Sequence, residues 1–263
     1  MKKLLFVALL CLSTAINAQT TYVLTMGIQN YNNPEFQHPS LFSSSNDAIV
    51  IDSIFKKKGA KTACLTGKYV TKENVMDKIR RMKYKVNEHP GKDNIAIFVS
   101  LHGSENGYIA AWDQHIYFGD ILNTLADAKA KNIFLFLNDC HAGSAGKVFL
   151  NLPKEKRNPN LFIFTACRVD ESAIDESILG SAWFSAALIK GLRGACDNNR
   201  DRIITVRELH QYIYDDVVRR CEKQNEYAKE HPDEKLLEND YAMHPQLYGP
   251  KSKMDETVIS YAE

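Results

Sequence analysis

Residues 134–143 read FLFLNDCHAG, an apolar run that stops at a cysteine between polar and small residues. A similar run, IAIFVSL over residues 95–101, stops at His102 and Gly103. Such runs are typical of strands buried on both faces of a parallel sheet, and α/β folds place their sites beyond the carboxyl ends of these strands. The two segments therefore predict strands that bring Cys140 and His102 together at one sheet edge, as a nucleophile and its base.

Strand-like and helix-like segments alternate along the rest of the chain. We expect further strands at residues 22–28, 61–65 and 161–165, a β-hairpin over 108–118 with its turn at 113–114, and a long loop over 144–160. Helices are expected over 44–58, 119–130 and 181–192, and along two apolar stripes: Val75, Met76, Ile79, Met82 and Val86 after a Thr71 cap, then Val206, Leu209, Ile213, Val217 and Cys221. This alternation predicts an α/β fold, with a mostly parallel sheet and helices on both faces.

The composition is that of an ordinary globular protein. With 263 residues, 44% of them hydrophobic, the chain is long enough to bury a substantial core. No repeat or change of composition marks a second domain, so we expect one domain over residues 20–250 and a C-terminal segment over 251–263. Lys plus Arg number 33 and Asp plus Glu 32, without a basic stripe, so a nucleic-acid partner is not expected.

The N-terminus has the pattern of a secretory signal peptide. A basic start, MKK, precedes an apolar stretch and small residues, so we expect residues 1–18 to be removed near Ala18. The alternatives are a buried first helix, which lacks a cap and a polar face, and a lipoprotein anchored through Cys11, where Leu10 is bulkier than such sites prefer. No other segment is long and apolar enough to span a membrane. The mature protein is therefore expected in the periplasm or the medium.

Cysteine usage fits this expectation only in part. Removal of residues 1–18 leaves an odd number of cysteines, so at least one stays unpaired in an oxidising compartment. Cys140 is the expected free thiol, since a nucleophile cannot be part of a disulfide. The pairing of the others does not follow from their spacing; they are Cys64, Cys167, Cys196 and Cys221.

The two strand-end motifs resemble those of a known family. SLHG at residues 100–103 and NDCHAG at 138–143 resemble the catalytic motifs of caspase-like peptidases, closest to metacaspases and their bacterial relatives. Other similar stretches follow in the family's order between about residues 21 and 220, at 23–31, 41–48, 165–173 and 183–188. The resemblance implies the caspase-like three-layer sandwich and a peptide or protein substrate.

The chemistry of such a site follows from its two side chains. The thiolate of Cys140 would attack a peptide carbonyl, while His102 takes up the thiol proton and later protonates the leaving amine. The resemblance implies that the backbone N–H groups of Gly103 and Cys140 stabilise the oxyanion, and no cofactor is required. His141 is expected to be structural, because adjacent strand residues point to opposite faces. A zinc site of His102, Cys140, His141 and Cys167 is an alternative that no metal-ligand spacing supports.

The resemblance to metacaspases also implies an acidic pocket for an Arg or Lys before the cut bond. Asp47 matches one acid of that pocket, whereas Asn138 stands at the place of the second. Ser44 and Ser100 would line the pocket, and Ser44 replaces the arginine of aspartate-specific caspases. We expect cleavage after Arg or Lys, with Asp47 supplying the charge. An uncharged preference stays open, as does a role for Asp47 in satisfying N–H groups of a helix first turn.

The expected loop over residues 144–160 is rich in basic side chains: Lys147, Lys154, Lys156 and Arg157. It is either a solvated connection or a site of self-processing, since such peptidases often cut themselves between these two strands. Self-cleavage there requires a specificity for basic residues, so the two hypotheses depend on each other.

Residues 197–208, DNNRDRIITVRE, resemble an EF-hand-like calcium loop. The ligands would include Asp197, Asn199, Asp201 and Glu208. Arg202 stands where such loops have glycine, which costs backbone strain and puts a cation near the metal. The alternative is a capping box of Thr205 and Glu208 at the start of a helix. Calcium is thus an optional cofactor, and both interpretations stay open.

The leading functional hypothesis is an exported cysteine endopeptidase. One alternative is an inactive caspase-like fold that serves as a binding module, although both catalytic positions are filled. Another is an acyl-transfer enzyme with the same dyad and an uncharged substrate pocket. The oligomeric state does not follow from the sequence.

Overall fold

The structure is a computed structural model that describes residues 19–175, 180–231 and 241–261. The expected signal peptide lies outside the described residues, as does the charged stretch over 232–240. Within the described ranges, no helix is both long and apolar enough to cross a bilayer.

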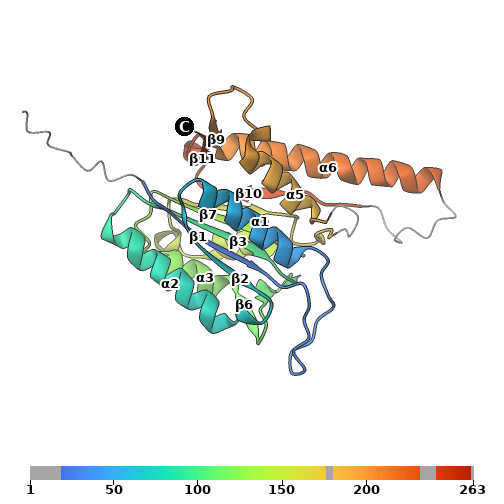
Figure 1. The fold of residues 1–263 in the computed structure, drawn as a ribbon, viewed down its shortest axis with the longest axis horizontal. Coiled ribbons are helices and arrows are strands. Elements are labelled where there is room, and N and C mark those ends of the chain that lie inside the picture. The colour runs from blue at the N-terminus through green and yellow to red at the C-terminus, as the bar shows by residue number, and fades with distance from the viewer. Residues whose placement is uncertain (1–18, 176–179, 232–240, 262–263) are drawn as a thin grey trace, which may run out of the picture.

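A six-stranded sheet forms the centre of the molecule (Figure 1), in the order β10-β8-β7-β3-β1-β2. Five strands run parallel, and β10 pairs antiparallel with β8 at one edge. The predicted mostly parallel sheet is therefore confirmed, although the short β10 was missed because it lacks an apolar run. The strands are β1 Thr21–Gly27, β2 Lys61–Thr66, β3 Asn94–Ser100, β7 Asn132–Asn138, β8 Leu161–Thr165 and β10 Gln246–Tyr248.

Helices cover both faces of the sheet and complete three layers (Figure 1). One layer contains α1, α5 and α6, in which α5 packs on both of the others; the other contains α2, α3 and α4, in which α3 packs on both. The helices are α1 Ser44–Lys57, α2 Lys72–Glu88, α3 Phe118–Leu125, α4 Gly143–Asn151, α5 Trp183–Lys190 and α6 Val206–Glu230.

Smaller elements surround this framework. The expected hairpin is present as β5 and β6, and β4 joins it as a third strand. Near the C-terminus, β11 pairs antiparallel with β9 just before α6. The bounds are β4 Gly103–Ser104, β5 Tyr108–Ala110, β6 His115–Tyr117, β9 Ile203–Thr205, β11 Thr257–Ser260, η1 Gly67–Tyr69, η2 Lys154–Lys156, η4 Gly191–Ala195 and η5 Lys251–Lys253.

The two central strands end level with each other. β3 pairs with β7 in a register that sets Ser100 opposite Asn138, and every residue of both strands is buried. His102 and Cys140 each follow two residues later. The predicted meeting of these two strand ends at one sheet edge is thus confirmed.

The helical stripes also lie where the sequence places them. The side chain of Thr71 caps α2 by accepting a hydrogen bond from the backbone N–H of Asn74. All five apolar residues expected on that helix are buried, as are the five expected on α6. A period of 3.6 residues therefore identified the faces that pack against the sheet and its neighbours.

The expected loop over residues 144–160 is wrong in its first half, which forms α4. Gly146 lies against the ring of Tyr248, and a Cβ there would come within 2.2 Å of that ring. Phe149 is buried on the same helix. Small residues permit this close packing. Glycine and serine have low helix propensity, so the sequence pattern did not indicate this helix.

α3 is shorter than expected and ends at Leu125. The side-chain amide of Asn158 donates hydrogen bonds to the carbonyl oxygens of Leu125 and Ala128, at 2.9 and 2.8 Å. These bonds satisfy carbonyl groups that a continued helix would have paired internally. A residue more than thirty positions away thus sets the helix end, which local sequence does not reveal.

A glycine at the end of β1 allows α1 to start directly above the strand. A Cβ on Gly27 would lie 2.1 Å from the carbonyl oxygen of Ser44, a backbone atom that cannot rotate away. We expect Gly27→Ala to lower the free energy of unfolding by about 1–3 kcal/mol, as overpacking of a core does, measured by urea denaturation. Gly119→Ala, where a Cβ meets no atom within 4 Å, should have little effect. Equal stabilities of the two variants would contradict this account of the contact.

Candidate active site

Cys140 lies in the turn after β7 and is partly exposed. Its Sγ is 3.8 Å from the carbonyl oxygen of Ala173, to which the thiol donates a weak hydrogen bond. Burial raises the pKa of this thiol above its usual range, and the hydrogen bond to Ala173 offsets part of that rise. The resting side chain is therefore a neutral thiol that needs a base to become a nucleophile.

His102 is held in one orientation by its surroundings. Its Nε2 is 2.8 Å from the carbonyl oxygen of Pro39, an acceptor to which Nε2–H donates, so the tautomer that this bond selects has its lone pair on Nδ1. The ring of His38 stacks on it at 5.4 Å between centroids. The hydroxyl of Tyr31 accepts a hydrogen bond from the His102 backbone N–H and donates one to the carbonyl of Ala110. These contacts restrict the orientation of the imidazole.

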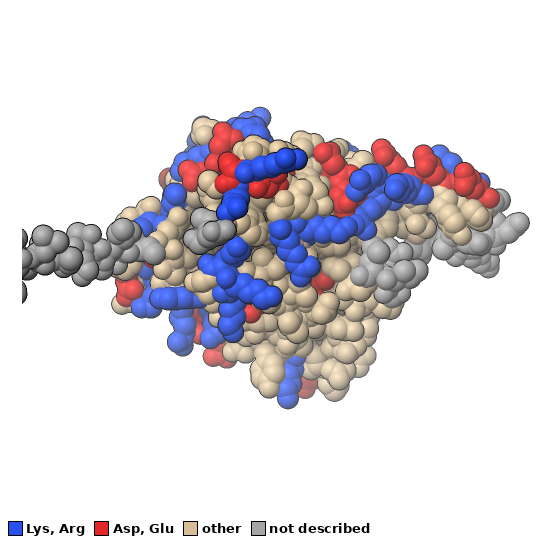
Figure 2. Space-filling model, turned by 45° about the horizontal axis from the view of Figure 1, so that its top comes forward, with Lys and Arg blue, Asp and Glu red and all other residues tan. Residues whose placement is uncertain are grey.

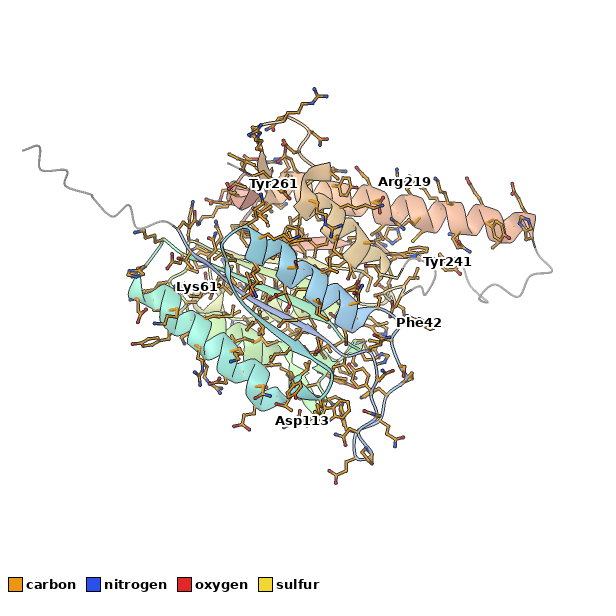
Figure 3. The ribbon with its side chains drawn as sticks, in the orientation of Figure 1. Phe42, Lys61, Asp113, Arg219, Tyr241 and Tyr261 are labelled. Atoms are coloured by element: carbon orange, nitrogen blue, oxygen red, sulfur yellow. The ribbon has the colours of Figure 1, made fainter. Side chains whose placement is uncertain are left out.

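One pocket brings Cys140 and His102 together with two of the expected substrate-binding residues, Ser44 and Asn138. Cys140 and His102 both line it, as do residues from α1, β7 and the loop after β8. Phe42, labelled in Figure 3, marks the end of α1 at which the pocket lies. The lining residues are Leu41, Ser44, Leu101, His102, Asn138, Asp139, Cys140, Ala173, Ile174, Asp175 and Ala182.

Three of the expected substrate-binding residues form a hydrogen-bonded chain. The amide of Asn138 donates to the hydroxyl of Ser100 at 3.0 Å, and that hydroxyl donates to the hydroxyl of Ser44, also at 3.0 Å. All three residues are buried. Ser44 and Asn138 reach the pocket wall, while Ser100 joins them from behind.

Asp47 is not part of the pocket lining. Its carboxylate is fully buried and accepts hydrogen bonds from the hydroxyl of Ser181 and from the backbone N–H of Ala182. Burial raises the pKa of Asp47 to about 6, while these donors act in the opposite direction. Asp47 thus ties the first turn of α1 to the segment before α5, rather than accepting from backbone N–H groups of its own helix turn.

The structure places a different acid, Asp175, in the pocket wall. Its carboxylate accepts hydrogen bonds from the backbone N–H of Phe42 at 2.7 Å and from the hydroxyl of Ser43 at 2.6 Å. Asp175 was not predicted from the sequence, because it lies in a loop with no periodic pattern. One signal was present, since the loop leaves the carboxyl end of a third buried strand, β8.

Gly103 and Asp139 pack directly against each other beside the dyad. A Cβ on Gly103 would lie 2.3 Å from both Asp139 Oδ2 and the carbonyl oxygen of Cys140. The carboxyl of Asp139 is fully buried, and neither oxygen has a hydrogen-bond partner among the described residues. Burial alone raises the pKa of Asp139 well above its ordinary value, so this acid is held in its neutral form.

We expect Asp139→Asn to remove a pH dependence of stability. In the wild type the native state keeps the Asp139 proton to a higher pH than the unfolded chain, whose carboxyl titrates near 3.8. The free energy of unfolding therefore falls as the pH rises above that value. Urea denaturation at pH 4 and pH 8 should show the variant gaining stability over the wild type at the higher pH. An equal difference at both pH values would show that Asp139 is ionised in the folded protein.

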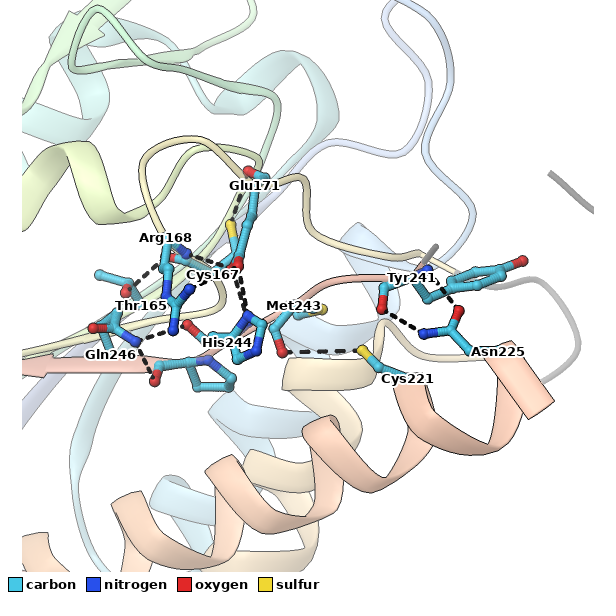
Figure 4. Close-up of polar contacts among 11 residues, drawn as sticks. Thr165, Cys167, Arg168, Glu171, Cys221, Asn225, Tyr241, Met243, His244 and Gln246 are labelled. Atoms are coloured by element: carbon cyan, nitrogen blue, oxygen red, sulfur yellow. Dashed lines mark hydrogen bonds and ion pairs between the residues drawn. The ribbon is translucent and has the colours of Figure 1, made fainter. Parts of the chain in front are cut away.

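The loop after β8 is fixed by the segment that precedes β10 (Figure 4). The carboxylate of Glu171 accepts a hydrogen bond from the backbone N–H of His244 at 2.8 Å and pairs with its ring. His141, in the left-handed region with φ 59°, bonds through its ring to the carbonyl of Val169. This contact fits the structural role expected for His141.

The structure also bears on the metal hypotheses. In the described ranges no three His, Cys, Asp or Glu side chains are arranged to hold a metal ion, and all five described cysteines are free. In the 197–208 loop, Glu208 takes part in the capping box with Thr205. The carboxylates of Asp197 and Asp201 and the amide oxygen of Asn199 bind backbone N–H groups of the loop itself. A calcium requirement stays a prediction.

Known proteins share this architecture. A structural-genomics protein from Geobacter sulfurreducens superimposes with a TM-score of 0.63 at 14% identity, covering 93% of this chain and 100% of its own. Caspase-1 from Spodoptera frugiperda superimposes with a TM-score of 0.61 at 16% identity, covering 88% and 86%. No curated protein sequence matches. The family model of the caspase domain matches residues 20–247, and the chain therefore belongs to the caspase-domain family of cysteine peptidases.

Proposed function

We propose that the protein is a cysteine endopeptidase in which Cys140 is the nucleophile and His102 the general base, and that it cleaves after Arg or Lys. The observation that supports this most strongly is the shared pocket: a neutral thiol, an oriented imidazole and a carboxylate all line one depression at the carboxyl edge of the sheet. Substrate sites of α/β folds lie at this edge.

The proposed reaction begins with proton transfer. The thiol proton of Cys140 passes to Nδ1 of His102, whose lone pair is left available by the Nε2 bond to Pro39. The sulfur attacks the peptide carbonyl, and the tetrahedral intermediate collapses as His102 gives the proton to the leaving amine. A water molecule, deprotonated by His102, then hydrolyses the thioester and regenerates the thiol.

The oxyanion of the intermediate is assigned to the backbone N–H groups of Gly103 and Cys140. The close approach of Gly103 to the Cys140 backbone supports this assignment, since any side chain there would collide with that backbone. Backbone donors held in place before the reaction stabilise developing charge effectively.

Specificity for a basic residue is assigned to Asp175. Asp175 lines the pocket, whereas Asp47 does not and its carboxylate is enclosed by hydrogen bonds from the segment before α5. Ser44 and Asn138 would add neutral hydrogen bonds at the base of the pocket. A guanidinium or ammonium group would then form a charge-assisted hydrogen bond with Asp175.

Self-processing is proposed for the short segment around η2. Lys154 and Lys156 are exposed there, whereas Lys147 lies within α4 and cannot adopt the extended form that a protease binds. The side chain of Arg157 donates a hydrogen bond to the carbonyl of Leu152, which holds that residue against the end of α4.

A panel of fluorogenic peptides tests the proposed function against its two alternatives. Peptides with Arg or Lys before the scissile bond should be cleaved fastest, the peptide with Asn more slowly and the peptide with Asp most slowly. An inactive binding module would cleave none of them, and an acyl-transfer enzyme would turn over only when an acceptor amine is added. The proposed export is tested separately, by locating the mature N-terminus in cell fractions.

Calcium dependence is proposed for the 197–208 loop and tested by a chelator titration. Removing calcium with EGTA should lower the melting temperature, and adding it back should restore the original value, because a ligand that binds the folded state stabilises it. Asp201→Asn should reduce that shift. If neither EGTA nor added calcium changes the melting temperature, the capping box is the sole role of Glu208.

A further inference from the structure

A second recess lies at the far end of α1 from the catalytic pocket. It has a volume of about 420 Å³, within the range of about 300–1,000 Å³ typical of small-molecule sites. Tyr261, labelled in Figure 3, lies above this end of α1. The recess is lined by Ile49, Val50, Ser53, Ile54, Lys57, Lys58, Leu192, Arg193 and Tyr261.

The floor of the recess is apolar. Ile49 is 53% exposed, although its side chain is wholly apolar. Leu192 and Ile54 are buried beneath it, and Val50 lies beside them. Apolar side chains gathered in a concave surface gain free energy when an apolar molecule displaces water from them.

The rim of the recess is positively charged. Lys57, Lys58 and Arg193 line it, and no acidic residue does. None of these three cations has an ion-pair partner among the described residues. Figure 2 shows Lys and Arg side chains gathered across the middle of the face turned to the viewer, with acidic side chains mostly along its upper edge.

Tyr261 closes the recess and adds an unused polar group. The Nζ of Lys58 lies 4.1 Å from the centroid of its ring, a cation–π contact that holds the ring in place. The hydroxyl oxygen of Tyr261 is buried and has no hydrogen-bond partner within the described ranges.

We propose that this recess binds a free anionic amphiphile, a molecule with an apolar chain and a carboxylate or phosphate head. The chain would lie over Ile49 and Leu192, and the head would meet Lys57 and Arg193 at the rim. A single molecule fits a recess of this size, whereas a flat bilayer surface does not reach its floor. The middle of the recess is about 15 Å along α1 from Ser44 in the catalytic pocket, at 1.5 Å per residue, so the proposal does not depend on the proposed peptidase activity.

Isothermal titration of the wild-type protein with decanoate, below its micelle concentration, tests the proposal. We expect saturable binding of one molecule per chain. Affinity should rise about fourfold for each methylene added between hexanoate and decanoate, as burial of apolar chain predicts. Acetate should bind far more weakly, because it lacks the chain, and decyltrimethylammonium should too, because its charge is reversed. Equal binding of decanoate and decyltrimethylammonium would overturn the proposal.

Two variants and one matched control locate the site. Lys57→Glu combined with Arg193→Glu should weaken decanoate binding at least about tenfold, since each removes a charge-assisted contact. Lys56→Glu makes the same charge change on a neighbouring exposed residue that does not line the recess, and it should bind as the wild type does. If the double variant fails to fold, Ile49→Asp tests the exposed part of the floor alone. An equal loss of decanoate affinity in Lys56→Glu would show that only the overall positive charge of this face matters, and would contradict a binding site in the recess.

Two further outcomes also count against the proposal. Sedimentation with vesicles of anionic phospholipid, without binding of monomeric decanoate, would assign the basic face to a membrane surface. Binding of an acidic peptide that decanoate does not displace would assign it to a protein partner.

Discussion

Replacing Cys140 by alanine is expected to lower kcat for peptide hydrolysis by about 10³-fold or more. No other described thiol lines the catalytic pocket, and without the sulfur there is no covalent intermediate to divide the reaction into two easier steps. The residual rate should reflect binding and oxyanion stabilisation alone. Initial rates on the best substrate of the fluorogenic panel measure the effect.

Two controls accompany this variant. Its melting temperature should stay close to that of the wild type, because Cys140 is partly exposed and makes one weak hydrogen bond. Cys64→Ala removes an exposed thiol on β2 and should leave turnover unchanged. Activity that survives in the Cys140 variant would mean that the nucleophile lies elsewhere in the chain.

Replacing Asp175 by asparagine is expected to lower kcat/KM for an arginine substrate by about 30- to 100-fold. The substitution keeps an oxygen for the Ser43 hydrogen bond, loses the acceptor for the Phe42 N–H and removes the negative charge facing the substrate cation. A charge-assisted hydrogen bond contributes about twice as much as a neutral one, and its loss leaves the substrate cation poorly paired.

A comparison of arginine and citrulline substrates isolates the effect of the charge. Citrulline has the shape of arginine without the charge, so the wild type should prefer arginine strongly, and the Asp175 variant should lose most of that preference. Asp170→Asn changes an exposed acid in the same loop that is absent from the pocket wall, and it should keep the preference. A variant of Asp175 that still discriminates as the wild type does would place the specificity on another residue, with Asp47 the first to test.

The central sheet was predictable because its strands are buried on both faces. β3 and β7 are apolar at nearly every position, so the pattern revealed where they end and hence where His102 and Cys140 lie. The segments that connect the strands were harder to predict. α4 begins with small residues that have low helix propensity, and the end of α3 is set by the distant side chain of Asn158.

Only part of the candidate site was predictable from the sequence. Four residues named from the sequence line the pocket, His102, Cys140, Ser44 and Asn138, because each follows or precedes an element with a clear period. The sequence did not distinguish Asp47 from Asp175, since both are acids near the ends of elements. Their difference depends on tertiary contacts: the segment before α5 covers Asp47, while the loop after β8 presents Asp175 to the pocket.

The partnership of Cys140 with His102 is tested most directly by alkylation with an arginyl chloromethyl ketone, followed by mass spectrometry of each cysteine peptide. We predict that Cys140 is labelled faster than any other cysteine, and at least about 100-fold more slowly in His102→Gln, while Cys64, which lies outside the pocket, serves as the reference thiol in both proteins. Labelling of Cys140 at an unchanged rate in the His102 variant, or no faster than that of Cys64 in the wild type, would contradict the account.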